Sequence, residues 1–232
     1  MRFGVLLCAH VDDDLLEEHG DYDRMYRDLL RKVDPNVEVV AYDAIGGELP
    51  SSPDECDGWI ITGSGFSAYD DEPWIEALRA FVREIHAHRA RLLGVCFGHQ
   101  IVAEALGGKV DRFSEFRLGP GTYQLDATDW WAGGEVTIPA FHGDVVVMPP
   151  PEAEVIGRSE GIDVGAMRVG DHILTIQNHP EYQPHYFDLL IERRGQGLPD
   201  DLKADARDRL ASMPHDDEVF SQWAMSFFDR DA

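Results

Sequence analysis

The first half of the chain alternates short apolar runs with longer amphipathic stretches. The apolar runs span five to seven residues and are rich in aliphatic side chains, which is typical of buried parallel strands. Between them the apolar positions recur at helical spacing, and one such stretch opens with Pro73, a residue favoured in the first helical turn. The pattern predicts strands over residues 3–9, 37–42, 58–62 and 91–95, and helices over residues 22–33 and 73–86.

The pattern changes near Leu118, where short apolar runs become separated by turn residues. It predicts antiparallel strands over residues 122–125, 135–138, 145–148, 154–158 and 164–168, and a further strand over 173–176. Beyond Pro184 the spacing is helical again, over residues 184–194, 199–213 and 216–230. Together these elements predict an α/β fold with three layers: a mostly parallel sheet flanked by helices, with an antiparallel extension and a helical C-terminus. We find no internal repeat or linker, so we expect one domain over residues 1–232, in which residues 184–232 form a helical extension.

Charge and cysteine content narrow the possible partners. The net charge of −24 argues against nucleic acid and anionic membranes, which repel an acidic surface. No stretch approaches the length of about 18 apolar residues that a membrane-spanning helix needs. We interpret residues 1–9 as a first strand rather than a signal peptide. The cysteines Cys8, Cys56 and Cys96 are too scattered for a disulfide framework, so we expect a reducing, cytoplasmic location.

Gly94-Val95-Cys96-Phe97-Gly98 follows the apolar pair Leu92-Leu93 and is similar to the nucleophile elbow of hydrolases, with a thiol in place of the serine hydroxyl. The elbow residue has a strained backbone, and side chains at Gly94 and Gly98 would collide with the neighbouring strand and helix. The turn leaves the sulfur at the start of a helix, where the macrodipole favours negative charge.

A histidine and a carboxylate complete this chemistry. His179-Pro180-Glu181 follows the predicted strand 173–176. An imidazole that acts as a base needs a third group to orient it, and Glu181 is the candidate. The three side chains therefore indicate a covalent thiol enzyme with Cys96, His179 and Glu181 as its catalytic residues.

Four segments in order resemble those of the class I glutamine amidotransferases, and the resemblance covers most of residues 1 to 182: Ile61-Thr62-Gly63-Ser64-Gly65, Gly94 to Gln100, His142-Gly143-Asp144 and His179-Pro180-Glu181. The residue directly before His179 is Asn178, and in this position the sequence resembles the stand-alone, GMP synthase-like and γ-glutamyl peptidase-like branch of that family. In such enzymes a cysteine attacks the glutamine side-chain amide and forms a glutamyl thioester.

The resemblance implies a role for each of these positions. Cys96 is the nucleophile, His179 the general base and then acid, and Glu181 orients the imidazole. The amide of Phe97 and an amide within Gly63-Ser64-Gly65 are candidates for stabilising the oxyanion. Gln100 and the segment His142-Gly143-Asp144 are expected to help bind the γ-glutamyl group. Phe66, Tyr69 and Phe97 are possible aromatic lining residues of the cleft.

Several functions fit this motif set. The first is a free-standing hydrolase of γ-glutamyl amide bonds in glutamine, a γ-glutamyl peptide or a γ-glutamyl amine. The alternative is a glutaminase subunit that delivers ammonia to a separate synthase; the chain carries no Gly-x-x-x-x-Gly-Lys-Ser/Thr motif, so that synthase would be another polypeptide. A third is a binding module without turnover. A fourth, a cysteine-elbow chaperone or glyoxalase, is disfavoured because the pair His179 and Glu181 matches amidotransferases better.

We expect a small-molecule substrate, no cofactor and no metal. His86 and His88 lie two apart in a predicted helix, so they point to different faces and make a poor metal pair. His10 with Asp12-Asp13-Asp14 is better explained as a solvated acidic loop.

Overall fold

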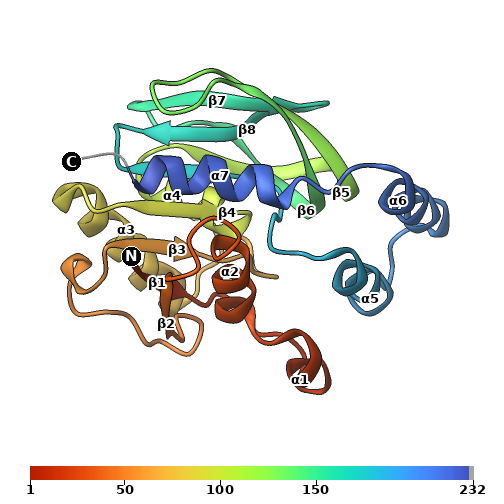
Figure 1. Ribbon diagram of the computed structural model, residues 1–232, viewed down its shortest axis with the longest axis horizontal. Helices are drawn as coiled ribbons and strands as arrows, with labels where there is room; N and C mark the ends of the chain where they lie inside the picture. Colours follow the sequence, from red (N-terminus) through yellow and green to blue (C-terminus); the bar gives the residue numbers. More distant parts are fainter. Residues whose placement is uncertain (230–232) are drawn as a thin grey trace.

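Nine strands form one sheet in the computed structural model, which describes residues 1–229 (Figure 1). The strands are β1 (Arg2–Leu6), β2 (Glu38–Tyr42), β3 (Gly58–Ile61), β4 (Leu92–Val95), β5 (Lys109–Leu125), β6 (Gly134–Met148), β7 (Ala153–Ser159), β8 (Ile162–Val169) and β9 (Ile173–Ile176). Their order across the sheet is β2-β1-β3-β4-β9-β8-β7-β5-β6. The pairings from β2 to β9 are parallel, and those from β9 to β6 are antiparallel. The predicted parallel sheet with an antiparallel extension is therefore confirmed.

Helices cover both faces of the sheet, as the three-layer prediction requires. The α-helices of the described residues are α1 (Leu16–His19), α2 (Tyr22–Leu30), α3 (Pro73–His88), α4 (Phe97–Ala105), α5 (Pro184–Arg194), α6 (Asp200–Ser212) and α7 (Asp217–Phe228). α2 and α7 pack together on one face, while α3 and α4 pack together on the other. Figure 1 shows α5 and α6 side by side near one end of β5 and β6. The predicted helices agree to within three residues; Arg230, the predicted end of the last helix, lies outside the described residues.

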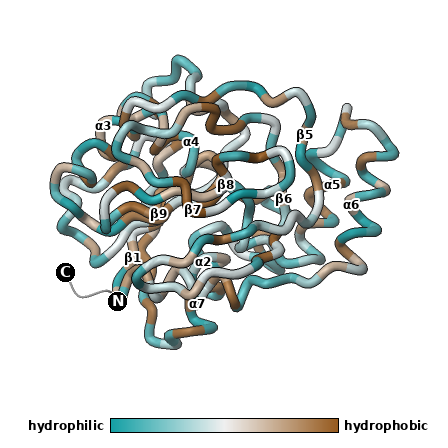
Figure 2. The backbone as a smooth tube through the Cα atoms, turned by 90° about the horizontal axis from the view of Figure 1, so that it is seen from above, coloured by the Kyte–Doolittle hydropathy of each residue, from teal (hydrophilic) through white to brown (hydrophobic). Residues whose placement is uncertain are grey.

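Alternation along the central strands builds two hydrophobic cores. In β1, Phe3 and Val5 face the core under α2 and α7, whereas Leu6 faces the core under α3 and α4. β3 follows the same rule, because Ile60 belongs to the first core and Ile61 to the second. Figure 2 shows the hydrophobic segments gathered around β1, β9 and β8. A strand buried on both faces appears in the sequence as a continuous apolar run, which is why the parallel strands were predictable.

The antiparallel extension departs from the prediction. Two long strands, β5 and β6, replace the predicted strands 122–125, 135–138 and 145–148. Pro120 lies opposite Pro139, and the register shifts between Arg112 and Arg117. Proline, glycine and bulge residues usually mark the end of a strand, but here the two strands bend together and stay paired past them. The predicted division of this region into short strands was therefore wrong.

A guanidinium attaches α6 to β5. Arg209 donates hydrogen bonds to the carbonyl oxygens of Leu118 (2.6 Å) and Pro120 (2.7 Å) and pairs with Asp205 at 2.8 Å. Between the two carbonyls, Gly119 has φ +96°, and a Cβ built there would lie 2.9 Å from Cα of Ala206. Glycine is therefore required both by the backbone angle and by the close approach of the helix.

The start of α7 depends on a buried carboxylate. Asp217 accepts hydrogen bonds from Lys32 and from Gln183 (2.6 Å), and its Oδ2 lies 3.3 Å from His215 Nε2. Burial opposes ionisation of Asp217, but the bonds from His215, Lys32 and Gln183 outweigh it and hold the carboxyl pKa well below its usual range. Ionised Asp217 therefore links α7 to the end of α2 and to the segment before α5.

We expect Asp217→Asn to lower the free energy of unfolding at pH 7 by about 1–3 kcal/mol, the typical cost of breaking buried charge-assisted hydrogen bonds. Because the folded pKa is depressed, this stabilisation is present above the unfolded pKa of about 3.9 and is lost as the pH falls through the folded pKa. Urea unfolding at several pH values measures it, with exposed Glu218→Gln as the control. A difference between wild type and variant that stays constant down to pH 2 would contradict the assignment.

No helix within residues 1–229 combines the length and apolar character needed to cross a bilayer.

Candidate functional site

The backbone at Cys96 is strained in the way that the elbow motif predicts. β4 ends at Val95, α4 begins at Phe97, and Cys96 between them has φ +53° and ψ −101°. A Cβ built on Gly94 would lie 2.5 Å from the carbonyl oxygen of Gly98, and one built on Gly98 would lie 2.4 Å from that of Ile61. The surrounding strands and helix leave no room for side chains at either glycine, so they hold Cys96 in this conformation.

Three neighbouring parallel strands bring the predicted residues together. β3, β4 and β9 are adjacent, and the segments that follow them carry Gly63, Cys96 and His179 respectively. The carboxyl ends of parallel strands share one edge of a sheet, which is where open α/β sheets bind ligands. Gly63 packs against the imidazole so closely that a Cβ built there would lie 2.6 Å from Cε1 of His179.

His179 is held in place from three sides. Its Nδ1 lies 2.8 Å from Oε1 of Glu181, and both side chains are buried. The ring of Tyr182 stacks on the imidazole, with centroids 4.2 Å apart and planes 9° from parallel. The backbone amide of His179 donates to the carbonyl oxygen of Pro139 in β6 at 2.8 Å. These contacts fix the ring plane and leave Nε2 as the nitrogen free for chemistry.

The electrostatics of His179 couple it to Cys96. Burial lowers the pKa of the imidazole, but its electrostatic interactions with Cys96 and with the Glu181 carboxylate outweigh burial and together raise it to about 10. Cys96 and Glu181 on either side of the ring therefore stabilise the imidazole when it carries a second proton.

Three of the predicted binding residues, Gln100, His142 and Asp144, form one hydrogen-bonded group. Gln100 donates from Nε2 to the carbonyl oxygen of Asp144 at 2.9 Å, and Nδ1 of His142 lies 3.1 Å from the same oxygen. The Asp144 carboxylate accepts from Ser67 at 2.6 Å and pairs with Arg112 at 3.3 Å. Burial lowers the pKa of His142 to about 3, so its imidazole is neutral at physiological pH.

A cavity of about 380 Å³ opens over the Cys96 sulfur. This volume falls within the range of about 300–1,000 Å³ that is typical of small-molecule sites. Of the predicted site residues, the cavity is lined by Gly63, Ser64, Gly65, Cys96, Gln100, His142, Gly143, Asp144 and His179. Glu181 lies behind the imidazole. The Phe97 side chain is fully buried against Trp74, so of the predicted aromatics Phe66 lines the cavity, while Phe97 and Tyr69 do not.

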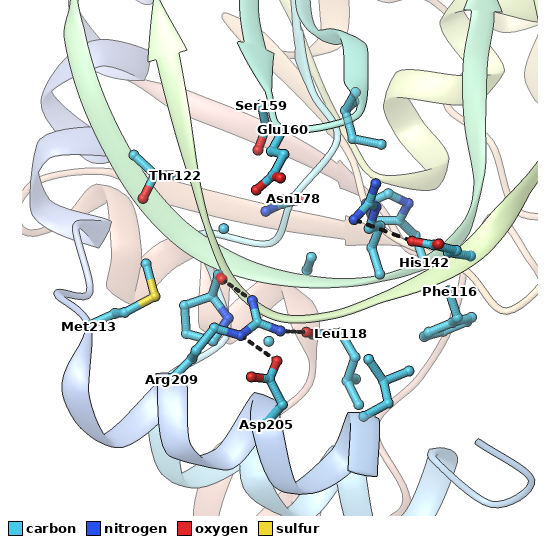
Figure 3. A pocket seen from close by; sticks show the side chains of 18 of the residues that line it. Phe116, Leu118, Thr122, His142, Ser159, Glu160, Asn178, Asp205, Arg209 and Met213 are labelled. Atoms are coloured by element: carbon cyan, nitrogen blue, oxygen red, sulfur yellow. Dashed lines mark hydrogen bonds and ion pairs between the residues drawn. The ribbon is translucent and has the colours of Figure 1, made fainter. Parts of the chain in front are cut away.

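A larger cavity, of about 1,080 Å³, adjoins this one and shares His142 and Phe116 with it. Figure 3 shows its lining residues, with Arg209 and Asp205 of α6 on one side and Ser159, Glu160 and Asn178 on the other. Cys96 and His179 do not line it. The smaller cavity, which Cys96 and His179 line, is therefore the candidate active site.

Several neighbours of Cys96 and His179 were not predicted from the sequence. Gln177 lies with Nε2 3.7 Å from the Cys96 sulfur. Tyr182 stacks on His179, and Arg112 and Arg194 line the cavity. Gln177 could have been predicted from the sequence, because it directly follows β9, and β9 lies next to β4 and its elbow. No sequence pattern indicates Arg194, because α5 reaches the cavity only through tertiary packing.

Comparisons with known proteins agree with this geometry. The model of the family described as glutamine amidotransferase class-I matches residues 15–195. The chain belongs to this family. Its relatives include gamma-glutamyl peptidase 2 of Arabidopsis thaliana, which is 32% identical over 203 residues, covering 83% of this chain and 81% of that protein. GMP synthase [glutamine-hydrolyzing] of Aeropyrum pernix is 28% identical over 70% of this chain, but only 31% of that longer enzyme is covered.

Two solved structures of glutamine amidotransferases share the fold. A glutamine amidotransferase from Thermotoga maritima superposes with a TM-score of 0.76 at 21% identity, over 98% of this chain and 95% of that chain. One from Methylobacillus flagellatus gives a TM-score of 0.71, also at 21% identity, over 98% of this chain and 91% of that chain. The predicted family and fold class are thereby confirmed.

Proposed function

We propose that this protein is a cysteine-dependent hydrolase of γ-glutamyl amide bonds that acts through a glutamyl thioester. The observation that carries the proposal is that Cys96, His179 and Glu181 are buried together at a small cavity. The chain that holds them is 32% identical to a gamma-glutamyl peptidase. A hydrolase of this kind needs an activated thiol, a base with an orienting carboxylate, and room for the donor.

In the first half-reaction the Cys96 sulfur attacks the γ-carbonyl carbon of the donor, and the thiol proton passes to His179. The carbonyl oxygen becomes an oxyanion. The amide of Phe97, which begins α4 and so has no acceptor within the helix, and an amide of Gly63-Ser64-Gly65 are our candidate donors to it. The C–N bond then breaks, His179 gives its proton to the leaving nitrogen, and a glutamyl thioester and a free amine remain.

In the second half-reaction water attacks the thioester carbonyl. His179 accepts the proton of this water and returns a proton to the sulfur as the C–S bond breaks, which releases glutamate and restores the Cys96 thiol. Glu181 stabilises the imidazolium in both half-reactions without transferring a proton itself. The raised pKa of His179 supports this division of roles.

The cavity lining supports a charged, amino-acid-like donor. Arg112 and Arg194 line it in a protein whose net charge is −24. A γ-glutamyl group carries an α-carboxylate and an α-ammonium, so it needs both cationic and anionic partners, and Asp144 supplies the second kind. We also infer a reducing compartment such as the cytoplasm, because Cys8, Cys56 and Cys96 are all free thiols.

A second candidate is a glutaminase subunit that delivers ammonia to a separate synthase. The similarity to part of the Aeropyrum pernix GMP synthase favours it. The two functions differ in the donor they prefer and in whether a partner is needed, so one set of rates separates them.

We expect the purified chain to cleave a γ-glutamyl dipeptide with a kcat/KM about tenfold or more above that for free glutamine, a difference of about 1.4 kcal/mol in transition-state binding. Glutamate release from glutamine, γ-glutamylglycine and a γ-glutamyl amine measures it. α-Glutamylglycine is the matched control, and we expect no cleavage of it. A higher kcat/KM for glutamine, or no activity toward any donor until a synthase is added, would favour the ammonia-delivering subunit. Equal cleavage of the α- and γ-linked dipeptides would refute both.

A further inference from the structure

Three possible metal ligands meet outside the candidate active site, where α1 approaches the start of α5. Glu18, His19 and His185 each offer one ligand atom, and these atoms all lie within 4.8 Å of one another. Nε2 of His185 is 3.5 Å and Nε2 of His19 is 3.9 Å from the same Oε1 of Glu18. We propose that Glu18, His19 and His185 bind a divalent zinc ion that links α1 to α5. This proposal does not depend on the proposed hydrolase function.

The spacing suits a tetrahedral ion. Zinc binds imidazole nitrogen and carboxylate oxygen at about 2.0–2.2 Å, which puts neighbouring ligand atoms of a tetrahedron roughly 3.3–3.6 Å apart. The observed separations from Glu18 are close to that value. Glu18 and His185 are exposed, so their side chains can close the remaining gap without moving the backbone. A water molecule would take the fourth position.

His19 has a polar atom without a partner. Its side chain is only 12% exposed, and Nε2 is buried with no hydrogen-bond partner among the described residues. A buried polar atom normally finds a partner because leaving it without one costs free energy. A metal ion between Glu18 and His185 would supply that partner.

The backbone around the site is held by ion pairs that do not use the ligands. Asp14 receives two hydrogen bonds from Arg193, both at 2.7 Å, and Asp12 pairs with Arg194. The His19 ring packs against Tyr186 of α5, with centroids 5.2 Å apart. The two segments are therefore brought together before any metal binds, which lowers the cost of assembling the site.

The donor set selects the class of ion. Two imidazoles and one carboxylate suit zinc and other late first-row metals, whereas calcium and magnesium prefer oxygen ligands. A net charge of −24 raises the local concentration of cations at the surface. Zinc is the member of this group with no geometric preference of its own, so it suits a site with one open position.

The position of the ion gives it a structural consequence. Tyr186 contacts Tyr182 with ring centroids 5.4 Å apart, and Tyr182 stacks on His179. α5 also contributes Leu190 and Arg194 to the cavity over Cys96. Zinc at the start of α5 would therefore stabilise the helix that forms one wall of the candidate active site.

The test is metal binding by the full chain, freed of metal by a chelator. We expect calorimetry to show one zinc ion per chain and cobalt(II) to give the strong visible absorption of a tetrahedral site. His185→Ala should weaken zinc binding at least about tenfold, a loss of about 1.4 kcal/mol, and lower the rise in Tm that zinc causes. His185 is exposed, so this variant is expected to fold.

His88→Ala is the matched control, because His88 is an exposed histidine of α3 outside the cluster. It should bind zinc as the wild type does, and Glu18→Gln should weaken binding in the same direction as His185→Ala. Absence of zinc binding by the wild type, or equal affinity in the wild type and His185→Ala, would overturn the proposal.

Discussion

Cys96→Ala is expected to lower kcat/KM for γ-glutamyl donors by about four orders of magnitude or more, as removal of a covalent nucleophile does in other hydrolases. Alanine keeps the Cβ, so the backbone at φ +53° experiences the same constraint while the attacking sulfur is gone. The circular dichroism spectrum should be unchanged, which separates lost chemistry from lost fold. Steady-state release of glutamate measures the effect.

The matched control for this variant is Cys56→Ala, which removes a free thiol that does not line the cavity. It should keep wild-type activity. Acid-quenched wild-type protein should show the mass of a glutamyl adduct on the peptide that contains Cys96, and Cys96→Ala should show none. Turnover by Cys96→Ala at a tenth of the wild-type rate or more would refute the covalent mechanism.

His179→Ala is expected to cost about four orders of magnitude in kcat, and Glu181→Gln about ten to a hundred times less, because the carboxylate orients and stabilises the imidazole but transfers no proton. A glutamine at position 181 still offers an oxygen to Nδ1 of His179, so the ring keeps its orientation and loses only the neighbouring charge. Single-turnover formation of the thioester compares the two variants.

The pH profile tests the role of Glu181 independently. The carboxylate is one of the groups that raise the pKa of His179, so Glu181→Gln should move the apparent imidazole pKa in kcat/KM downward. Glu84→Gln, an exposed carboxylate on α3, should leave the profile in place. A Glu181→Gln variant that is slower than His179→Ala, or that has an unshifted profile, would show that the carboxylate does something else.

The parallel half of the sheet was predictable because its strands are buried on both faces. Phe3, Val5, Ile60 and Leu93 form continuous apolar runs with their neighbours, and such runs leave few alternative structures. The β5–β6 hairpin was not predictable from the sequence. Its direction of burial changes along two long strands, and Pro120 opposite Pro139 carries the usual signal of a turn. Only the pairing of the two prolines shows that the strands continue, and pairing is not visible in a single strand's sequence.

The candidate site also has a part that was predictable from local sequence and a part that was not. The glycines around Cys96 are local to the elbow, so the elbow could be predicted from its own five residues. Gln177 contacts Cys96 because β9 pairs with β4, and Tyr182 contacts His179 because the chain turns back after Glu181. Arg194 reaches the cavity from a helix that begins after the last predicted site residue. Contacts of this second kind depend on tertiary structure and have no signature in local spacing.

The backbone angle of Cys96 also bears on how this protein can evolve. A residue with a side chain at φ +53° and ψ −101° lowers the stability of the fold, and glycine is the substitution that would relieve it. If the sulfur is the nucleophile, that substitution stabilises the fold and ends the activity in one step. Selection for thermal stability alone would therefore remove the cysteine, so its presence in this unfavourable conformation supports the proposal that its sulfur is retained for chemistry.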